Sequence, residues 1–218
     1  MSTAKNKILI SIDWFLPGTN SGGPVRSIAN LVKHLPEIEF WIITRDTDYL
    51  SEISYDGIQS DQWTTFSQNV HVFYVSGQNL NTMNIEKIIL ETEIKTLYVN
   101  GVYSKYFSIL PLKIGKKNNL KTIVAPRGMF SSQAMKIKRT KKMVFAKLMN
   151  ARRAYKDIVF HITSEHEQHE INSIIKPLPK CVIIPNLPRI QIERIETMNK
   201  IKGSLFKPGL LYLASKGY

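Results

Sequence analysis

The sequence is poor in cysteine and has no long apolar run. Its single cysteine, Cys181, excludes an internal disulfide, so nothing favours an oxidising compartment. No apolar stretch approaches the roughly 20 residues that a membrane-spanning helix needs. The apolar run that follows Lys7 ends at Asp13 and is too short for the core of a signal peptide. We therefore expect a cytoplasmic protein, with peripheral attachment to the inner face of a membrane as an option.

Acidic residues are also scarce. The 218 residues include 17 Asp and Glu against 30 Lys and Arg, which gives a formal net charge of +13. Such a surplus favours anionic partners, namely nucleic acid, an acidic membrane surface or phosphorylated substrates. The hydrophobic content of 43% and charged content of 22% are typical of a soluble globular protein. Composition therefore indicates a globular chain with an attraction to anions.

Short apolar segments alternate with segments of helical spacing. The face formed by Ile28, Leu31, Val32 and Leu35 has the spacing of an amphipathic helix that begins near Pro24. Residues 47–69 are polar and irregular. Strands are expected at 7–12, 39–44, 70–75, 96–99, 122–125, 158–163 and 182–184. The predicted fold is α/β and Rossmann-like, with a mostly parallel sheet flanked by helices.

Polar or glycine residues follow most of these strands. They are Asp13, Arg45, Asp46, Asn100, Gly101, Arg127, Gly128, Ser164, Glu165 and Asn186. The carboxyl ends of parallel strands share one edge, where open α/β sheets bind ligands, so these residues are expected to line one crevice. Arg127 suits two-pronged contact with carboxylate or phosphate. The alternative is that Arg127 only ties a helix to a loop carbonyl or a structural carboxylate.

Gly22 and Gly23 lie between the first strand and the first helix. Glycine allows close backbone approach to a ligand, and a helix N-terminus favours anions. However, the segment Ser-Gly-Gly-Pro is not a dinucleotide fingerprint, and no Walker lysine occurs. A plain flexible turn is the alternative.

Two other motifs suggest a metal ion. Asp46 and Asp48 form an Asp-x-Asp pair, but two Asp residues after a strand more often serve as a turn or a helix cap. His166 and His169 lack a third ligand, and Ser164 followed by Glu167 is a capping box that places these histidines on a polar helix face. We expect no metal and no cofactor.

A basic segment follows the fifth strand and is predicted to be one long helix from Ser131 or Ser132. Its cations are Lys136, Lys138, Arg139, Lys141, Lys142, Lys147, Arg152, Arg153 and Lys156. An apolar stripe accompanies them, formed by Ile137, Val144, Leu148, Ala151 and Tyr155. Lys138, Arg139, Lys141 and Lys142 are the candidates for an anion-binding or membrane-binding surface. Nucleic acid is less favoured, because few aromatic residues are interleaved for stacking.

Several segments together resemble glycosyltransferase family 4, which has the GT-B fold, and in particular its bacterial members that build lipopolysaccharide and other surface polysaccharides. The resemblance covers about residues 7–190 in the family's order. The segments are SGGPVRSIANL (21–31), TRDTDYL (44–50) with Tyr55 and Trp63 downstream, VNGVYSKYFSILPL (99–112), APRGMFSSQAMKIKRTKK (125–142), HITSEHEQHEI (161–171) and IIPN (183–186).

The resemblance implies one half of a GT-B fold, the N-terminal domain that binds the acceptor. Gly22 and Gly23 would lie near the diphosphate of a nucleotide-sugar donor. Arg127 and Gly128 would belong to the acceptor side of the cleft, and Ser164 and Glu165 would face it. The implied reaction is a metal-free, retaining hexosyl transfer to a glycan or glycolipid acceptor.

Residues 1–198 would form the acceptor-side domain and 199–218 a linker with a truncated start of the donor-binding domain. The family's cationic residues for the leaving diphosphate have no match, so the chain is expected to be inactive alone or to need a separate donor-domain chain. The alternative is a non-catalytic basic module that binds an acidic membrane or nucleic acid.

Overall fold

The computed structural model describes residues 6–189, and the expected donor-domain start at 199–218 lies outside them. These residues form an eight-stranded sheet in the order β3-β4-β2-β1-β5-β6-β7-β8. All neighbouring strands are parallel except β3 and β4, which are antiparallel. The strands are β1 Lys7–Ser11, β2 Glu39–Arg45, β3 Trp63–Ser67, β4 Val70–Val75, β5 Thr96–Asn100, β6 Lys121–Ala125, β7 Val159–Ile162 and β8 Lys180–Ile183. The α/β, Rossmann-like prediction is confirmed.

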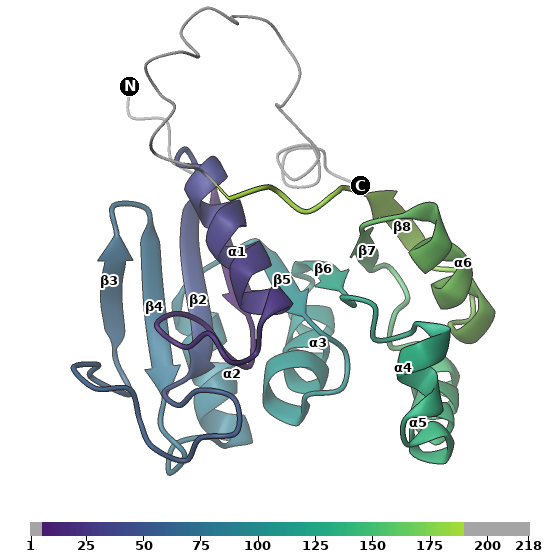
Figure 1. The fold of residues 1–218 in the computed structure, drawn as a ribbon, viewed down its shortest axis with the longest axis horizontal. Coiled ribbons are helices and arrows are strands. Elements are labelled where there is room, and N and C mark those ends of the chain that lie inside the picture. The colour runs from purple at the N-terminus through teal and green to yellow at the C-terminus, as the bar shows by residue number, and fades with distance from the viewer. Residues whose placement is uncertain (1–5, 190–218) are drawn as a thin grey trace, which may run out of the picture.

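Helices connect most of the parallel strands. They are α1 Gly23–His34, α2 Thr82–Glu91, the π-helix η1 Lys105–Ile109, α3 Leu110–Lys117, α4 Ser132–Lys136, α5 Arg139–Ala151 and α6 Glu165–Ile174. The helix α1 crosses one face of the sheet, and α4 and α5 lie at the edge of the ribbon nearest β7 and β8 (Figure 1). The helical segment after β5 begins as the π-helical turn η1 and continues as α3.

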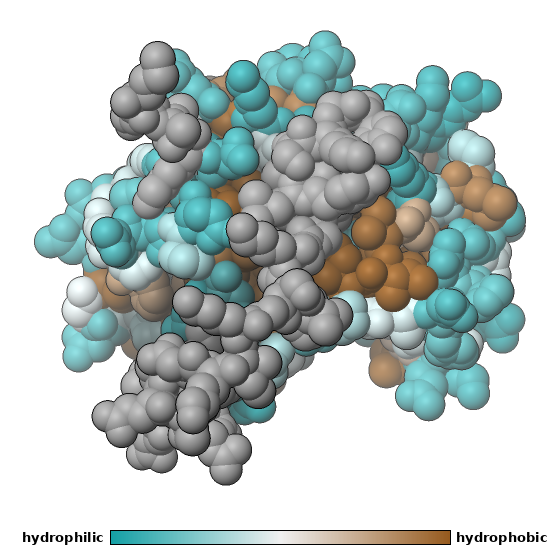
Figure 2. All heavy atoms as spheres, turned by 90° about the horizontal axis from the view of Figure 1, so that it is seen from above, coloured by the Kyte–Doolittle hydropathy of each residue, from teal (hydrophilic) through white to brown (hydrophobic). Residues whose placement is uncertain are grey.

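Alternation along the strands divides the core into two layers. On β1, Ile8 and Ile10 pack with the apolar face of α1, whereas Leu9 packs on the opposite side with α2, α3 and α6. A strand that is buried on both faces is apolar throughout, which is why the central strands read as continuous apolar runs. On the face seen from above, hydrophilic residues predominate around a hydrophobic area near its centre (Figure 2).

Two predictions about elements were wrong. Residues 47–69 are not all irregular, because the edge strand β3 lies within them. The basic segment is not one helix either. Lys138 has a φ of 55°, in the left-handed region, and this residue separates α4 from α5. Arg152, Arg153 and Lys156 follow the end of α5 in a turn.

Candidate functional site

Arg127 lies just past the carboxyl end of β6. Because β5 and β6 are parallel, with Asn100 opposite Ala125, Arg127 lies beside Asn100 at the edge of the sheet. Its guanidinium donates three hydrogen bonds, from Nε to Asn100 Oδ1 at 2.8 Å, from Nη1 to Asn186 Oδ1 at 2.8 Å and from Nη2 to Tyr98 Oη at 3.1 Å. A guanidinium has five N–H groups, so two remain for a ligand. Arg127 therefore does tie loops together, but its acceptors are neutral amide and hydroxyl oxygens.

A buried chain of hydrogen bonds continues from Arg127 into the sheet. The Tyr98 hydroxyl lies 2.7 Å from His161 Nδ1, and His161 Nε2 lies 3.0 Å from the carbonyl oxygen of Ile184. A carbonyl only accepts, so Nε2 carries the proton and Nδ1 accepts from Tyr98. Burial, helped by the positive charge of Arg127, lowers the pKa of His161 to about 4. Burial likewise raises the pKa of Tyr98. Both groups are therefore neutral near pH 7 and hold Arg127 in place.

A cavity of about 420 Å³ opens beside this arginine. Its lining includes Gly23, Ser27, Arg127, Gly128, Ser164 and Asn186. The helix α1 begins at this cavity without a side-chain cap, and a Cβ built on Gly22, Gly23 or Gly128 would meet no atom within 4 Å. Free N–H groups at a helix start, open glycine backbone and an arginine together suit an anionic ligand.

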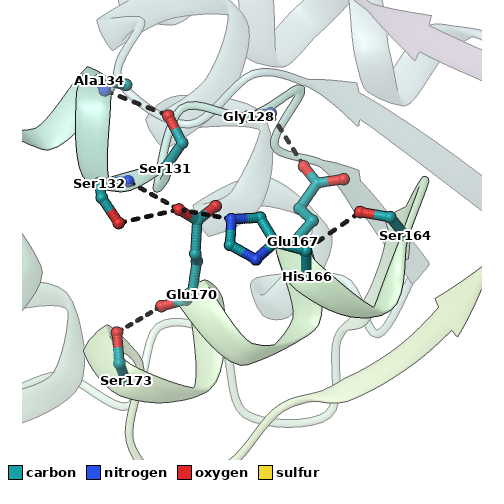
Figure 3. Close-up of polar contacts among 9 residues, drawn as sticks. All are labelled: Gly128, Ser131, Ser132, Ala134, Ser164, His166, Glu167, Glu170 and Ser173. Carbon is teal, nitrogen blue, oxygen red and sulfur yellow. Dashed lines mark hydrogen bonds and ion pairs between the residues drawn. The ribbon is translucent and has the colours of Figure 1, made fainter.

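The opposite wall of the cavity comes from α6. Glu167 is buried, and its carboxylate accepts hydrogen bonds from Gly128 N at 2.9 Å and from Thr163 N and Oγ1 at 2.9 and 3.0 Å. Glu170, on the same side of α6, accepts from the backbone and hydroxyl of Ser132, and Figure 3 shows both carboxylates directed at this loop. These carboxylates fix the loop that carries Arg127 and Gly128. The Ser164 hydroxyl accepts from Glu167 N at 3.2 Å, as a capping residue does.

A second cavity, of about 310 Å³, lies at the same edge and is partly lined by Asn100. Its lining includes Asp13, Trp14, Ser21, Tyr49, Asn100 and Met129. The rings of Trp14 and Tyr49 meet edge to face with centroids 4.9 Å apart. Burial raises the pKa of Asp13, although Asp13 Oδ1 accepts from Ser104 Oγ at 2.8 Å and lies 3.6 Å from Arg45 Nη2. This cavity thus combines aromatic surface with a partly buried carboxylate and an amide.

The structure brings four of the six candidate cleft residues to one cavity, namely Gly23, Arg127, Gly128 and Ser164. Gly22 and Glu165 do not occur among its described lining residues, and each is the chain neighbour of one that does. Tyr98, His161 and Ser27 were not predicted as site residues. Tyr98 and His161 lie between apolar neighbours in β5 and β7, and only the strand-end residues Asn100, Arg127 and Asn186 indicated this network.

The acidic residues after β2 organise loops. Asp46 is buried and accepts from the hydroxyls of Ser54 and Ser60, both at 2.8 Å. Asp48 accepts from the backbone N–H groups of Thr19 and Asn20. His166 and His169 lie on the exposed face of α6, and His166 Nε2 is 3.4 Å from Glu170. Within residues 6–189, no group of three or more His, Cys, Asp or Glu residues could hold a metal ion.

No protein-family model matches the sequence, and no curated protein matches it. Among solved structures, the chain is similar to sucrose-phosphate synthase from Thermosynechococcus elongatus, with a TM-score of 0.49 and 13% sequence identity. The match covers 84% of this chain and 48% of that protein, so the chain spans about half of its length. Similarity at this level does not establish a family. No helix among the described residues is long and apolar enough to cross a membrane.

Proposed function

We propose that the chain is the acceptor-side half of a glycosyltransferase, which moves a sugar from a nucleotide-sugar to a glycan or glycolipid acceptor. The ordered resemblance to glycosyltransferase family 4 supports this proposal. So does the position of the two cavities at the carboxyl edge of a parallel sheet, where α/β folds bind ligands. The acceptor is of the lipid-linked or lipopolysaccharide type, and the transfer is a retaining hexosyl transfer.

The observation that carries the proposal is the anchored arginine. Three neutral acceptors orient Arg127 and leave two N–H groups beside the uncapped start of α1. A charge held rigidly in advance stabilises developing negative charge without reorganisation when the reaction occurs. Gly22 and Gly23 would approach the donor diphosphate. Arg127 and Gly128 would belong to the acceptor side of the same cleft, with the free N–H groups of Arg127 facing that diphosphate.

The remaining site residues have secondary roles in this proposal. Ser164 and Glu165 begin α6 on the wall that faces the cleft. The cavity of Asp13, Trp14 and Tyr49 offers aromatic rings and hydrogen-bonding groups, which together suit the apolar faces and hydroxyls of an acceptor sugar. The nucleotide-sugar is a co-substrate, and the chemistry requires no metal or other cofactor.

A second wall is needed to close the cleft. We propose that a donor-binding domain, in the same or a separate chain, supplies the groups that neutralise the departing diphosphate. Two arginines lie at this edge of the described sheet. Arg45 is 3.6 Å from Asp13 and is partly neutralised by it, whereas Arg127 lines the 420 Å³ cavity. Residues 6–189 alone should therefore transfer sugar poorly.

Ligand-observed NMR with inorganic pyrophosphate and with a panel of nucleotide-sugars tests the site. Wild type should bind weakly, and Arg127→Ala should weaken binding at least about tenfold, because it removes a charge-assisted donor pair. Arg26→Ala is the matched control, since it removes an exposed arginine from α1 near the same cavity. Equal losses in both variants would show a diffuse effect of charge and would contradict the assigned site.

A transfer assay tests the reaction. Radiolabelled nucleotide-sugars and lipopolysaccharide-type glycolipids are incubated with the chain, with and without an added donor-binding domain. Transfer should require that domain and should fall about 10²-fold in Arg127→Ala. Transfer by the purified chain alone would refute the proposal that a donor-binding domain is required. If no donor domain gives activity, the non-catalytic basic module becomes the better account.

A further inference from the structure

The outer face of α5 carries apolar side chains that the fold does not bury. Val144 and Leu148 are one helical turn apart and are 61% and 44% exposed, and Ile137, just before α5, is 67% exposed. These three residues belong to the apolar stripe that accompanies the basic segment in the sequence. The residues of α5 that are buried are instead Ala146 and Met149. The break at Lys138 sets the orientation of α5 independently of α4.

Cations surround this face and carboxylates are rare near it. The exposed set is Lys136, Lys138, Arg139, Lys141, Lys147 and Arg152, and none of these forms an ion pair within 4.0 Å in the described part of the chain. The sequence has no Asp or Glu between Glu93 and Asp157. Lys142, which the sequence placed in this set, turns inward instead. Its Nζ donates to Ala134 O and lies 5.2 Å from the ring centroid of Tyr103.

We infer that this face of α5 docks on a bilayer that contains anionic lipid. Val144 and Leu148 would enter the boundary between headgroups and acyl chains, with the surrounding lysines and arginines on the phosphates. Long basic side chains can cover apolar surface with their stems while their charges stay in the headgroup layer. Ile137 extends the apolar surface beyond the N-terminus of α5.

The composition of the face favours lipid over nucleic acid. The residues at its centre are aliphatic, and no aromatic ring lies among the exposed residues named above to stack on a base. A nucleic acid would use the cations and leave Val144 and Leu148 in water, whereas a bilayer uses both. This surface lies on helices at the edge of the molecule, apart from the Arg127 cavity, and its role does not depend on the proposed reaction (Figure 1).

Vesicle co-sedimentation of the full chain tests the inference, with vesicles of phosphatidylcholine alone or mixed with phosphatidylglycerol. The chain should pellet with the anionic vesicles, and added NaCl should weaken but not abolish binding. The double variant Val144→Ser/Leu148→Ser should bind at least about tenfold more weakly, because two apolar side chains no longer leave water. Lys141→Gln/Lys147→Gln should weaken binding and flatten its salt dependence.

The matched control is Met83→Ser, which removes an apolar side chain that is 76% exposed on α2. It should bind as wild type does, and thermal melts should show that every variant folds. Unchanged binding of Val144→Ser/Leu148→Ser would overturn the inference, as would equal binding to both kinds of vesicle. So would gel shifts in which RNA binds as tightly as the anionic vesicles do. The remaining alternative is that a second copy of the chain covers this face of α5. Light scattering without vesicles tests it: a dimer that forms in wild type and is lost in Val144→Ser/Leu148→Ser would identify the second copy as the occupant and overturn the inference.

Discussion

At the scale of single residues, Arg127 is held in a conformation that most residues avoid. Its φ of 54° lies in the left-handed region, which costs a non-glycine residue of the order of 1 kcal/mol or more. Such a residue persists where its surroundings over-determine it, and here Asn100, Asn186 and Tyr98 fix the side chain. Backbone strain retained at a cavity indicates that the position of the guanidinium matters more than local stability.

His161 should make the fold sensitive to acid. Its pKa is about 4 in the folded chain and about 6.5 when unfolded, so the unfolded state binds more protons between these values. The contribution of neutral His161 is complete above about pH 6.5 and is lost as the pH falls toward 4, by up to about 3 kcal/mol. Urea unfolding of wild type and His161→Gln at several pH values between 7 and 4 measures this difference.

Other acidic groups titrate in both wild type and His161→Gln, so the effect of His161 is the difference between their free energies of unfolding at each pH. Wild type should lose stability faster than His161→Gln across this range, although the variant starts lower because it disturbs the hydrogen bond to Tyr98. Parallel pH profiles for the two proteins would show that His161 is not the group responsible.

At the scale of elements, the first turn of α6 depends on Ser164. Its hydroxyl accepts from Glu167 N, so Ser164→Ala should reduce the free energy of unfolding by about 1 kcal/mol, whereas Ser164→Gly should cost only a few tenths. Chemical denaturation measures both. Ser173→Ala is the matched control at the other end of α6, where its hydroxyl bonds only to the carbonyl of Glu170. A similar loss in Ser173→Ala would mean that serine removal, rather than loss of the cap, is being measured.

Elements with strong periodicity could be predicted, and those set by tertiary packing could not. The buried face of α1, the central strands and the Ser164 cap follow from apolar spacing and capping chemistry. The break at Lys138 has no glycine or proline to announce it, so the sequence read as one helix. The apolar spacing of Val144 and Leu148 likewise did not indicate whether they would face the core or the solvent, and the structure leaves both exposed.

At the scale of the whole molecule, the edge of the sheet was predictable but its hydrogen bonds were not. The rule that parallel strands end at one edge is enough to bring Asn100, Arg127 and Ser164 to one side of the sheet. The contact between Tyr98 and His161 joins residues 63 positions apart, and each is flanked by apolar residues in its strand. Nothing local distinguishes a buried tyrosine or histidine that holds an arginine from one that only fills space.

The surplus of positive charge should make the stability of the whole chain depend on salt. With a net charge of +13, mutual repulsion opposes the compact state, and a shorter Debye length weakens that repulsion. Raising NaCl from about 20 mM to about 300 mM should therefore increase the free energy of unfolding, by the order of 1 kcal/mol, in urea titrations at pH 7.

Pyrophosphate and NaCl can then be compared at matched ionic strength. Pyrophosphate should stabilise wild type further, and this extra gain should be absent in Arg127→Ala, because it comes from binding to the folded site. A stability that falls with added NaCl would mean that contacts such as Arg45 with Asp13 outweigh the repulsion.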